Sequence, residues 1–266
     1  MSSTALFLSC LAAWGTARLV ITRGLWRSQL NYRGRPVGLG GGAILATGST
    51  VGWLVGYFLG LPPREVGLFT VGSLTMFVLG AADDRWGDPQ VKGFKGHLRR
   101  WRQRGGDTAL LKAAGAFSLG LAAARLSSGS GWEAIGDALV VALSANAVNL
   151  LDLRPGRALK GFSLGFLLLL ISGTSMALLL GPLVAAAVAY APHDFRERLM
   201  LGDSGANLLG VALGLAAALS FSGREQLFVL GGLIVLHLFA EKGSISRLIE
   251  RVSWLGYMDR LGRPKE

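Results

Sequence analysis

The sequence predicts an all-α protein, a polytopic integral membrane helix bundle with about nine transmembrane helices. Of the 266 residues, 51% are hydrophobic and only 16% are charged, whereas about a quarter of the residues of a soluble domain are charged. The mean hydropathy is +0.47, and apolar segments recur at roughly the 20 residues that cross a bilayer as a helix. Only short polar loops separate them, so we expect a single transmembrane domain over residues 1–266 that ends in an amphipathic cytoplasmic tail (242–266).

The expected spans can be placed one by one along the chain. The first apolar run has no basic region before it and is followed by arginines, so it is interpreted as a span and not as a cleaved signal peptide. Its cysteine, Cys10, is the only one in the chain, which excludes an intrachain disulfide. The nine spans are expected near residues 4–22, 37–60, 65–82, 109–126, 133–151, 161–178, 181–192, 205–221 and 226–241.

The positive charges indicate how the chain is oriented in the membrane. The net charge is +11, and with these spans every Lys and Arg except Arg64, Arg125 and Arg224 falls on one side. Cytoplasmic loops carry such an excess of Lys and Arg. We therefore expect a multi-pass protein of the cytoplasmic membrane, with its N-terminus outside and its C-terminus in the cytoplasm. Because the charge follows the membrane topology, nucleic acid is not an expected partner.

Two adjacent carboxylates, Asp83 and Asp84, end the third span. Acidic side chains do not favour a helix C-terminus, and neighbouring carboxylates repel each other unless a cation lies between them. Mg²⁺ is usually held by such hard oxygen ligands together with substrate phosphates. The alternative is that the charge simply stops the helix. The basic segment that follows (92–102) is expected to form an interfacial helix on the membrane surface.

Further polar groups stand near the ends of other spans. Lys112 lies just inside the fourth apolar run, where it either snorkels back to the surface or points at a phosphate. Asn146, Asn149 and Asp152 are spaced three residues apart, so on a helix they share one polar face. That face either lines a cavity or bonds to another helix, and Arg154 would add positive charge to its rim.

Two glycine-containing segments begin spans. Asp203 and Ser204, in the sequence LGDSGAN, serve either as a helix N-cap or as part of a metal–phosphate site. The run Gly38–Gly42 allows close approach of a ligand or of a neighbouring helix. His237, on the ninth span, has the pattern of a packing residue.

The acidic motifs point to one site when they are taken together. In the expected topology Asp83, Asp84, Asn149, Asp152 and Asp203 all fall on the cytoplasmic side. An acidic centre at the membrane surface, surrounded by basic loops, suits a metal-dependent phosphoryl transfer.

These motifs resemble those of the polyprenyl-phosphate N-acetylhexosamine-1-phosphate transferases and occur in the family order. The matching pieces are NYRGRPVGLGGG, AADDRWG, Lys112, NAVNLLD and LGDSGANLLG. The resemblance implies an Mg²⁺-dependent enzyme that transfers a sugar-1-phosphate from a UDP-N-acetylhexosamine to undecaprenyl or another polyprenyl phosphate. It releases UMP and starts a cell-envelope glycan such as peptidoglycan. The partners implied are these two substrates and membrane lipid, with a homodimer left open.

The resemblance also implies roles for single residues. Asp83 would position or deprotonate the lipid phosphate, while Asp84 and Asp203 would hold Mg²⁺, with Asp203 as the more direct ligand. All three would be catalytic. The substrate-binding residues would be Lys112, Asn146, Asn149, Asp152, Arg154 and His237.

The chain departs from the family pattern at three points. NLLDLRPGRALK stands where many members read NLTDGLDGLA, which removes a second acid and adds arginine. The usual histidine-rich loop is reduced to His237, followed by Glu241 and Lys242. Nine spans are expected where the family has ten or more. These departures leave the UDP-sugar open, and the alternative function is a catalytically altered member that binds or transports polyprenyl phosphate.

Overall fold

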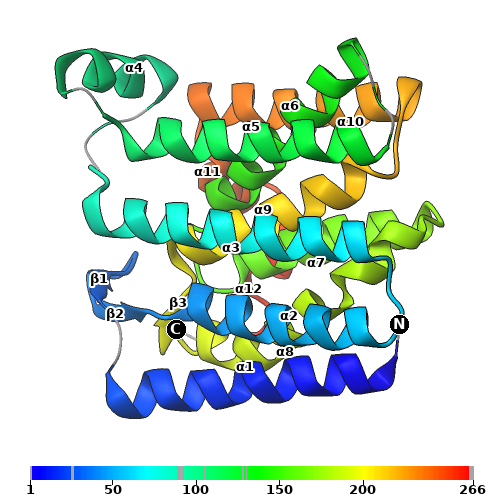
Figure 1. Ribbon diagram of the computed structural model, residues 1–266. Helices are drawn as coiled ribbons and strands as arrows, with labels where there is room; N and C mark the ends of the chain where they lie inside the picture. The colour runs from blue at the N-terminus through cyan, green and yellow to red at the C-terminus, as the bar shows by residue number, and fades with distance from the viewer. Residues whose placement is uncertain are drawn as a thin grey trace.

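The structure is a computed structural model that describes residues 2–24, 27–88, 91, 93–104, 106–127, 129 and 131–263. It is a bundle of long helices, as expected (Figure 1). The helices are α1 (Ser3–Arg23), α2 (Gly41–Phe58), α3 (Pro63–Trp86), α4 (Gly93–Arg104), α5 (Thr108–Leu126), α6 (Trp132–Leu151), α7 (Arg157–Ile171), η1 (Ser175–Leu180), α8 (Gly181–Phe195), α9 (Gly202–Ala218), α10 (Gly223–Lys242), α11 (Ile245–Arg251) and α12 (Ser253–Arg260).

Six helices within the described residues are long and apolar enough to cross a membrane. They are α1, α3, α5, α6, α10 and the continuous segment of η1 and α8. The helices α2, α7 and α9 also coincide with expected spans but have only 18, 15 and 17 residues. The chain is therefore a multi-pass helical membrane protein, while the number nine and the orientation of the termini stay predictions.

The expected boundary between the spans 161–178 and 181–192 was wrong. The expected span 161–178 ends early, because α7 stops at Ile171 and Gly173 adopts a left-handed φ of 75°. Thr174 then caps η1 by accepting the backbone N–H of Met176, and η1 leads directly into α8. An apolar run records that a segment is buried in lipid or protein, but not where the backbone reverses.

The helix α9 is the centre of the bundle. All of its residues except Asp203 and Leu213 are buried, and α3 and α6 pack extensively along it. Its sequence GDSGANLLGVALGLAAA is rich in Gly and Ala, which let neighbouring backbones approach closely. Asp203, in the first turn of this buried helix, is therefore held at a fixed place at one end of the bundle.

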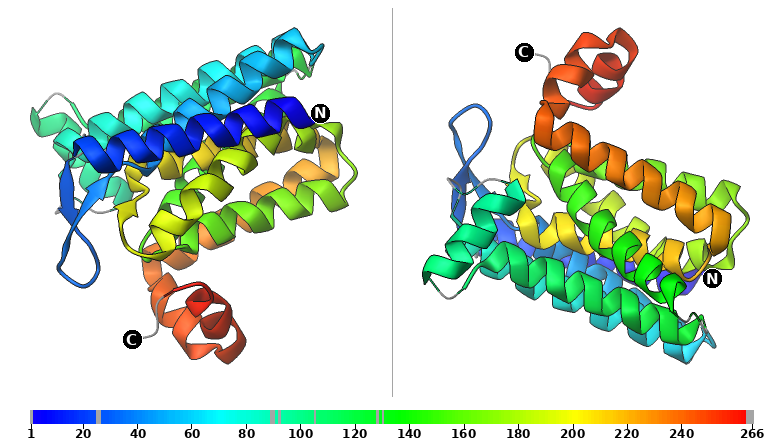
Figure 2. Two further views of the ribbon diagram at one scale, coloured as in Figure 1. Left: turned by 90° about the horizontal axis from the view of Figure 1, so that it is seen from below. Right: turned by 90° about the horizontal axis from the view of Figure 1, so that it is seen from above.

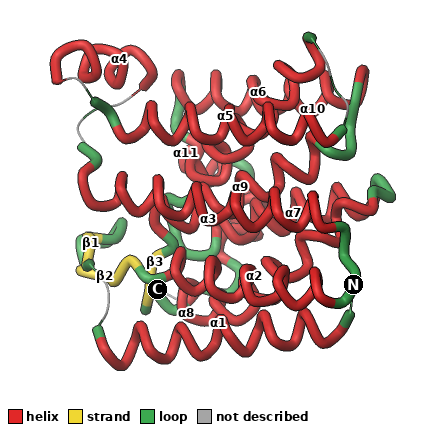
Figure 3. The backbone as a smooth tube through the Cα atoms, viewed as in Figure 1, coloured by secondary structure: helices red, strands yellow, loops and turns green. Residues whose placement is uncertain are grey.

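A small three-stranded sheet, which the sequence analysis did not anticipate, lies at that same end (Figure 3). The strands β1 (Ser28–Leu30) and β2 (Pro36–Leu39) form an antiparallel hairpin between α1 and α2. The short strand β3 (Leu199–Met200) pairs parallel to β2, with Gly38 opposite Leu199. Residues 37–39 thus do not begin a helix as expected, because strand pairing holds them extended, and α2 begins only after Gly40. The sheet ties the segment after α1 to the start of α9.

The polar peripheral elements gather toward the end of the bundle away from the N-terminus. Figure 2 shows the β-hairpin, α4 and the pair α11–α12 on that side. The expected tail is not one continuous helix: its backbone is extended at Val252, with φ −96° and ψ 106°, and separates α11 from α12. Residues 264–266 of the tail and Lys92 of the basic segment lie outside the described residues.

Candidate functional site

Two carboxylates from different helices converge on one lysine. Lys112 in α5 donates hydrogen bonds to Asp83 at the end of α3 and to Asp203 at the start of α9. The lysine is only 7% exposed, so it does not snorkel to the surface. Of the two alternatives for Lys112, the structure supports a position inside the site. We refer to Asp83, Lys112 and Asp203 as the acid–lysine cluster.

The neighbouring carboxylate, Asp84, faces a different group. Its two oxygens accept the backbone N–H groups of Asp203, at 2.9 Å, and of Ser204, at 3.1 Å. The first N–H groups of a helix lack intrahelical partners and attract negative charge. Asp84 therefore caps α9 from another helix, a role that Asp203 and Ser204 do not fill themselves.

Glycines allow these helices to meet without intervening side chains. A Cβ atom on Gly80 would lie 2.5 Å from the carbonyl oxygen of Asp203, so only glycine fits at this point of α3. A Cβ atom on Gly42 would lie 2.8 Å from the backbone nitrogen of Gly205. The run Gly38–Gly42 thus serves helix packing, one of its two expected uses.

The start of α5 is fixed by an acid and a hydroxyl. Asp107 caps the helix by accepting the backbone N–H of Leu110 at 3.1 Å, and it also pairs with His97 of α4 at 3.0 Å. Burial opposes ionisation of Asp107, but the hydrogen bond and charge of His97 together with the backbone N–H groups of Leu110 and Ala109 outweigh it and lower the pKa of this carboxyl. One residue later, Thr108 donates to Asp83. These contacts place Asp83 and Lys112 on a common rigid frame.

A pocket beside the cluster is lined by residues from four segments. Asp152 and Arg154 of the loop between α6 and α7 face Tyr32 of the hairpin and Glu197 after α8. Asp152 lies one residue beyond the end of α6, and not on its helical face as expected. Desolvation, followed by the charges of Asp194, Asp203 and Asp84, raises the pKa of Asp152 well above its ordinary value. The pocket is thus electrostatically connected to the cluster.

Three other candidates are not joined to the cluster by a contact among the described residues. Asn146 is exposed and Asn149 is half-buried on α6. The Nδ1 atom of His237 lies 2.7 Å from the carbonyl oxygen of Leu233 in its own helix, α10. Within the described residues, no hydrogen bond or ion pair joins these three to the acid–lysine cluster, so their substrate contacts stay predictions.

Several residues around the site were not singled out as functional residues in the sequence. Glu197 accepts hydrogen bonds from Asn31 at 3.1 Å and from Tyr32 at 3.2 Å, and its φ of 56° marks a left-handed turn. Asn207 donates to the carbonyl oxygen of Asp203 at 2.7 Å. Arg27 donates to the carbonyl oxygen of Arg85 at 2.7 Å and so caps α3. Only their position in the fold identifies them.

The donor set of the cluster suits a hard cation. Asp83 and Asp203 supply two carboxylates that already share a positive ammonium group. Within the part of the chain that the structure describes, no group of three or more His, Cys, Asp or Glu side chains has the arrangement of a metal site. Mg²⁺ is often held by one or two carboxylates, with substrate phosphates and water as its other ligands. The cluster fits that pattern.

A comparison with protein families finds one match. Residues 66–221 match the family described as "Glycosyl transferase family 4". The match begins in α3 and ends just after α9, so it includes Asp83, Asp84, Lys112, Asp152 and Asp203. No curated protein matches the chain.

Proposed function

Because the chain belongs to glycosyl transferase family 4, the family of phospho-MurNAc-pentapeptide and GlcNAc-1-phosphate transferases, we propose that its donor is a UDP-N-acetylhexosamine. At the coarser level, the protein is a membrane transferase of the polyprenyl-phosphate sugar-1-phosphate type. In the proposed reaction, an oxygen of the lipid phosphate forms a bond to the phosphorus that carries the sugar. The bond between that phosphorus and the UMP oxygen breaks, and UMP leaves.

The observation that carries this proposal is the convergence of Asp83 and Asp203 on Lys112 at one end of the helix bundle. Lys112 would bind a phosphate oxygen and stabilise the negative charge that develops on the leaving UMP. Electrostatic attraction of this kind is strongest in a site from which water is excluded. Asp83 would orient the attacking lipid phosphate. The neighbouring bilayer would hold the isoprenoid chain.

Asp203 and Asp83 would hold Mg²⁺, and Asp84 would keep Asp203 in place by capping α9. This assignment moves the second metal ligand from Asp84 to Asp83, because Asp83 and Asp203 converge on the same lysine whereas Asp84 faces the backbone N–H groups that begin α9. The ion, when bound, supplies Lewis-acid polarisation of the pyrophosphate oxygens. Asp152 and Arg154 would face the nucleotide sugar in the adjoining pocket.

The test is release of UMP by the purified protein in lipid nanodiscs. A panel of UDP-sugars, including UDP-GlcNAc and UDP-MurNAc-pentapeptide, is supplied with undecaprenyl phosphate, with and without Mg²⁺. We expect Mg²⁺-dependent UMP release, and a loss of about 100-fold or more in the Asp203→Asn variant. The matched control is Glu225→Gln, which removes an exposed acid at the start of α10.

Undiminished turnover in Asp203→Asn would contradict the role of this carboxylate. Binding of undecaprenyl phosphate without UMP release from any donor would instead support the alternative, a protein that binds or transports the lipid phosphate.

A further inference from the structure

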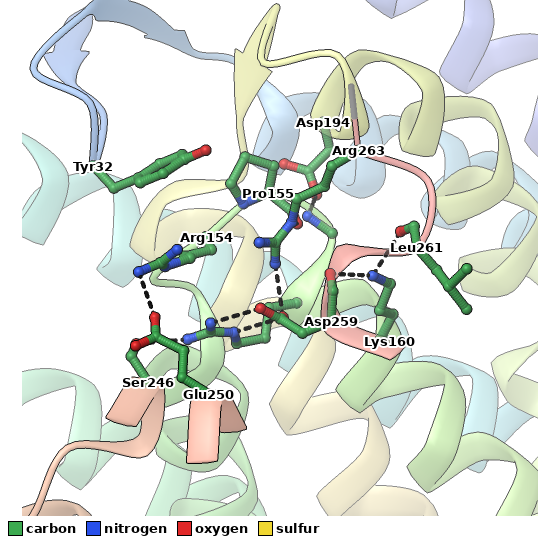
Figure 4. Close-up of polar contacts among 12 residues, drawn as sticks. Tyr32, Arg154, Pro155, Lys160, Asp194, Ser246, Glu250, Asp259, Leu261 and Arg263 are labelled. Carbon is green, nitrogen blue, oxygen red and sulfur yellow. Dashed lines mark hydrogen bonds and ion pairs between the residues drawn. The ribbon is translucent and has the colours of Figure 1, made fainter. Parts of the chain in front are cut away.

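The two C-terminal helices are attached to the loop that follows Asp152. We refer to residues 245–263, which contain α11 and α12, as the C-terminal arm. The arm lies outside the residues that match the family. It packs against the segment between α6 and α7, residues 153–156, and against the first turn of α7 (Figure 4). The contacts are ionic and therefore specific in geometry.

The central contact joins Arg157 to Asp259. The guanidinium donates two parallel hydrogen bonds of 2.9 Å to the two carboxylate oxygens. Arg157 is 4% exposed and Asp259 is 8% exposed. Bidentate pairs of this kind fix orientation as well as distance. Arg157 also donates to Ser246 of α11, at 2.8 Å, so one side chain holds both helices of the arm.

Two further cations complete the attachment. Arg263 donates to Asp259 at 2.7 Å and to the carbonyl oxygen of Pro155 at 2.8 Å. Lys160 donates to the carbonyl oxygens of Asp259, at 2.7 Å, and of Leu261, at 2.8 Å. Lys160 of α7 therefore finds its acceptors on the arm, while Arg263 of the arm donates to the loop.

The loop is held from the opposite side as well. The backbone N–H of Gly156 donates to Asp194 of α8 at 2.8 Å. Arg154, on the pocket rim, is fixed by Glu250 of α11 at 2.8 Å, and its guanidinium lies 5.2 Å from the centre of the Tyr32 ring. The arm therefore contacts a residue that lines the pocket.

These contacts explain how the charges of this segment are balanced. The segment NLLDLRPGRALK has a basic end that contains Arg154, Arg157 and Lys160. Here Asp259 and Glu250, about a hundred residues later, provide carboxylates to that same segment.

We propose that the C-terminal arm positions the α6–α7 loop for the sugar nucleotide, with Asp259 acting through Arg157 and Glu250 acting through Arg154. These are positioning residues, because neither is placed against the reacting atoms. The inference rests on the proposed transferase function for its ligand, a UDP-sugar. It assigns to the arm an effect on donor binding and not on the chemical step.

The experiment compares the full-length protein with Asp259→Asn in nanodiscs, by steady-state kinetics and by hydrogen exchange of residues 152–157. We expect KM for the UDP-sugar to rise about tenfold, because a loosened loop misplaces its contacts, while kcat changes less than about threefold. Exchange in residues 152–157 should become faster, and UMP should protect them less. The control Glu241→Gln removes an exposed acid just before the arm and should leave all three readouts unchanged.

A double variant separates positioning from instability of the arm. Arg157→Gln with Asp259→Asn removes both charges of the bidentate pair and leaves only Arg263 without its carboxylate partner, so its thermal midpoint should return part of the way toward the wild-type value. Its KM should stay raised, because the bidentate pair is still missing. A return of KM to the wild-type value would overturn the positioning role.

Unchanged loop exchange and unchanged KM in Asp259→Asn would also overturn the inference. If the wild-type protein releases no UMP from any donor, the proposed function fails. In that case hydrogen exchange of residues 152–157 still tests whether the arm holds the loop. Faster exchange in Asp259→Asn supports this role, and equal exchange refutes it.

Discussion

The ammonium group of Lys112 determines how the acidic residues of the site behave. Without a positive charge between them, Asp83 and Asp203 would repel each other in a setting with little water. Lys112 and both acids each lie near one end of a helix. The packing of these helices therefore brings the three side chains together. A single side chain thus contacts both carboxylates.

Replacing Lys112 by Met keeps much of the bulk and removes the charge. We expect UMP release to fall by about 100-fold or more. We also expect the thermal midpoint without divalent ions to fall by about 5 °C. Added Mg²⁺ should raise the midpoint of Lys112→Met more than that of the wild type, because the ion takes over the neutralisation of Asp83 and Asp203.

The control for this variant is Arg125→Met, which removes an exposed charge at the far end of the same helix. It should leave activity and the Mg²⁺ response unchanged. An identical Mg²⁺ response in Lys112→Met and wild type would argue against a shared cation site.

At the scale of elements, the contact between α3 and α9 is the one that forms the site. Gly80 lets the backbone of α9 begin directly against α3, and this brings Asp84 within hydrogen-bonding distance of the N–H groups of Asp203 and Ser204. A side chain at this position would separate the two helices. The close approach explains why the capping acid can come from a neighbouring helix.

The Gly80→Ala variant tests this contact. The added Cβ would meet the backbone of Asp203 and Ser204, and overpacking of this kind costs about 1–3 kcal/mol of stability. We expect a drop in thermal midpoint together with a loss of about tenfold or more in UMP release, because Asp203 moves away from Lys112. Gly67→Ala in the same helix meets no atom within 4 Å and should be neutral or stabilising. Equal behaviour of the two variants would contradict the role of Gly80.

The attachment of the C-terminal arm should depend on pH. Burial opposes ionisation of Asp259, but Arg157 and Arg263 outweigh it and lower its pKa. A carboxyl whose pKa is lower in the folded state stabilises that state above its unfolded pKa, about 3.9, and loses this contribution as the pH falls through the folded value.

Protection of the arm from a protease should therefore be constant from neutral pH to about pH 5 and decrease below about pH 4. Limited cleavage by an acid-stable protease, followed by mass spectrometry, measures this protection. In Asp259→Asn the decrease should disappear, because no proton is then taken up at this position. A wild-type arm that is equally protected at acidic and neutral pH would show that the ion pair does not hold it.

At the scale of the whole molecule, the polar elements gather at one end of the bundle, and the basic loops lie there (Figures 1 and 2). The sheet, α4, the acid–lysine cluster and the arm all belong to this end. The positive-inside rule predicts that it faces the cytoplasm. The proposed donor, a UDP-sugar, would then approach from that side.

Cysteine labelling tests this orientation. Single cysteines replace Ser3, Arg224 or Arg251 in a chain that carries Cys10→Ser, and all three positions are exposed. A membrane-impermeant maleimide should label Ser3→Cys and Arg224→Cys in intact cells, and Arg251→Cys only after permeabilisation. The reverse pattern would overturn the orientation, and labelling of Ser3→Cys and Arg224→Cys from opposite sides would overturn the odd number of spans.

The sequence by itself determined that the chain is a helical membrane protein, and it predicted a common site for Asp83, Asp84, Lys112 and Asp203, which the structure brings together. These features are local, because hydrophobic runs mark helices and charges mark their ends. It also determined the family, since the motifs occur in order along one region of the chain. The resemblance implied different roles for the adjacent residues Asp83 and Asp84, but the sequence did not show which groups they contact.

Only the tertiary structure decided which groups Asp83 and Asp84 contact. Asp84 meets a backbone N–H group 119 positions later, and Asp83 meets a lysine 29 positions later. The pairing of β2 with β3 and the attachment of Asp259 to Arg157 likewise join distant segments. Such contacts depend on which helices pack together. Hydrophobic periodicity does not determine the packing partners, because every apolar helix has a similar pattern, whether it faces lipid or protein. The packing of α9 against α3 and α6 therefore decides which charges meet.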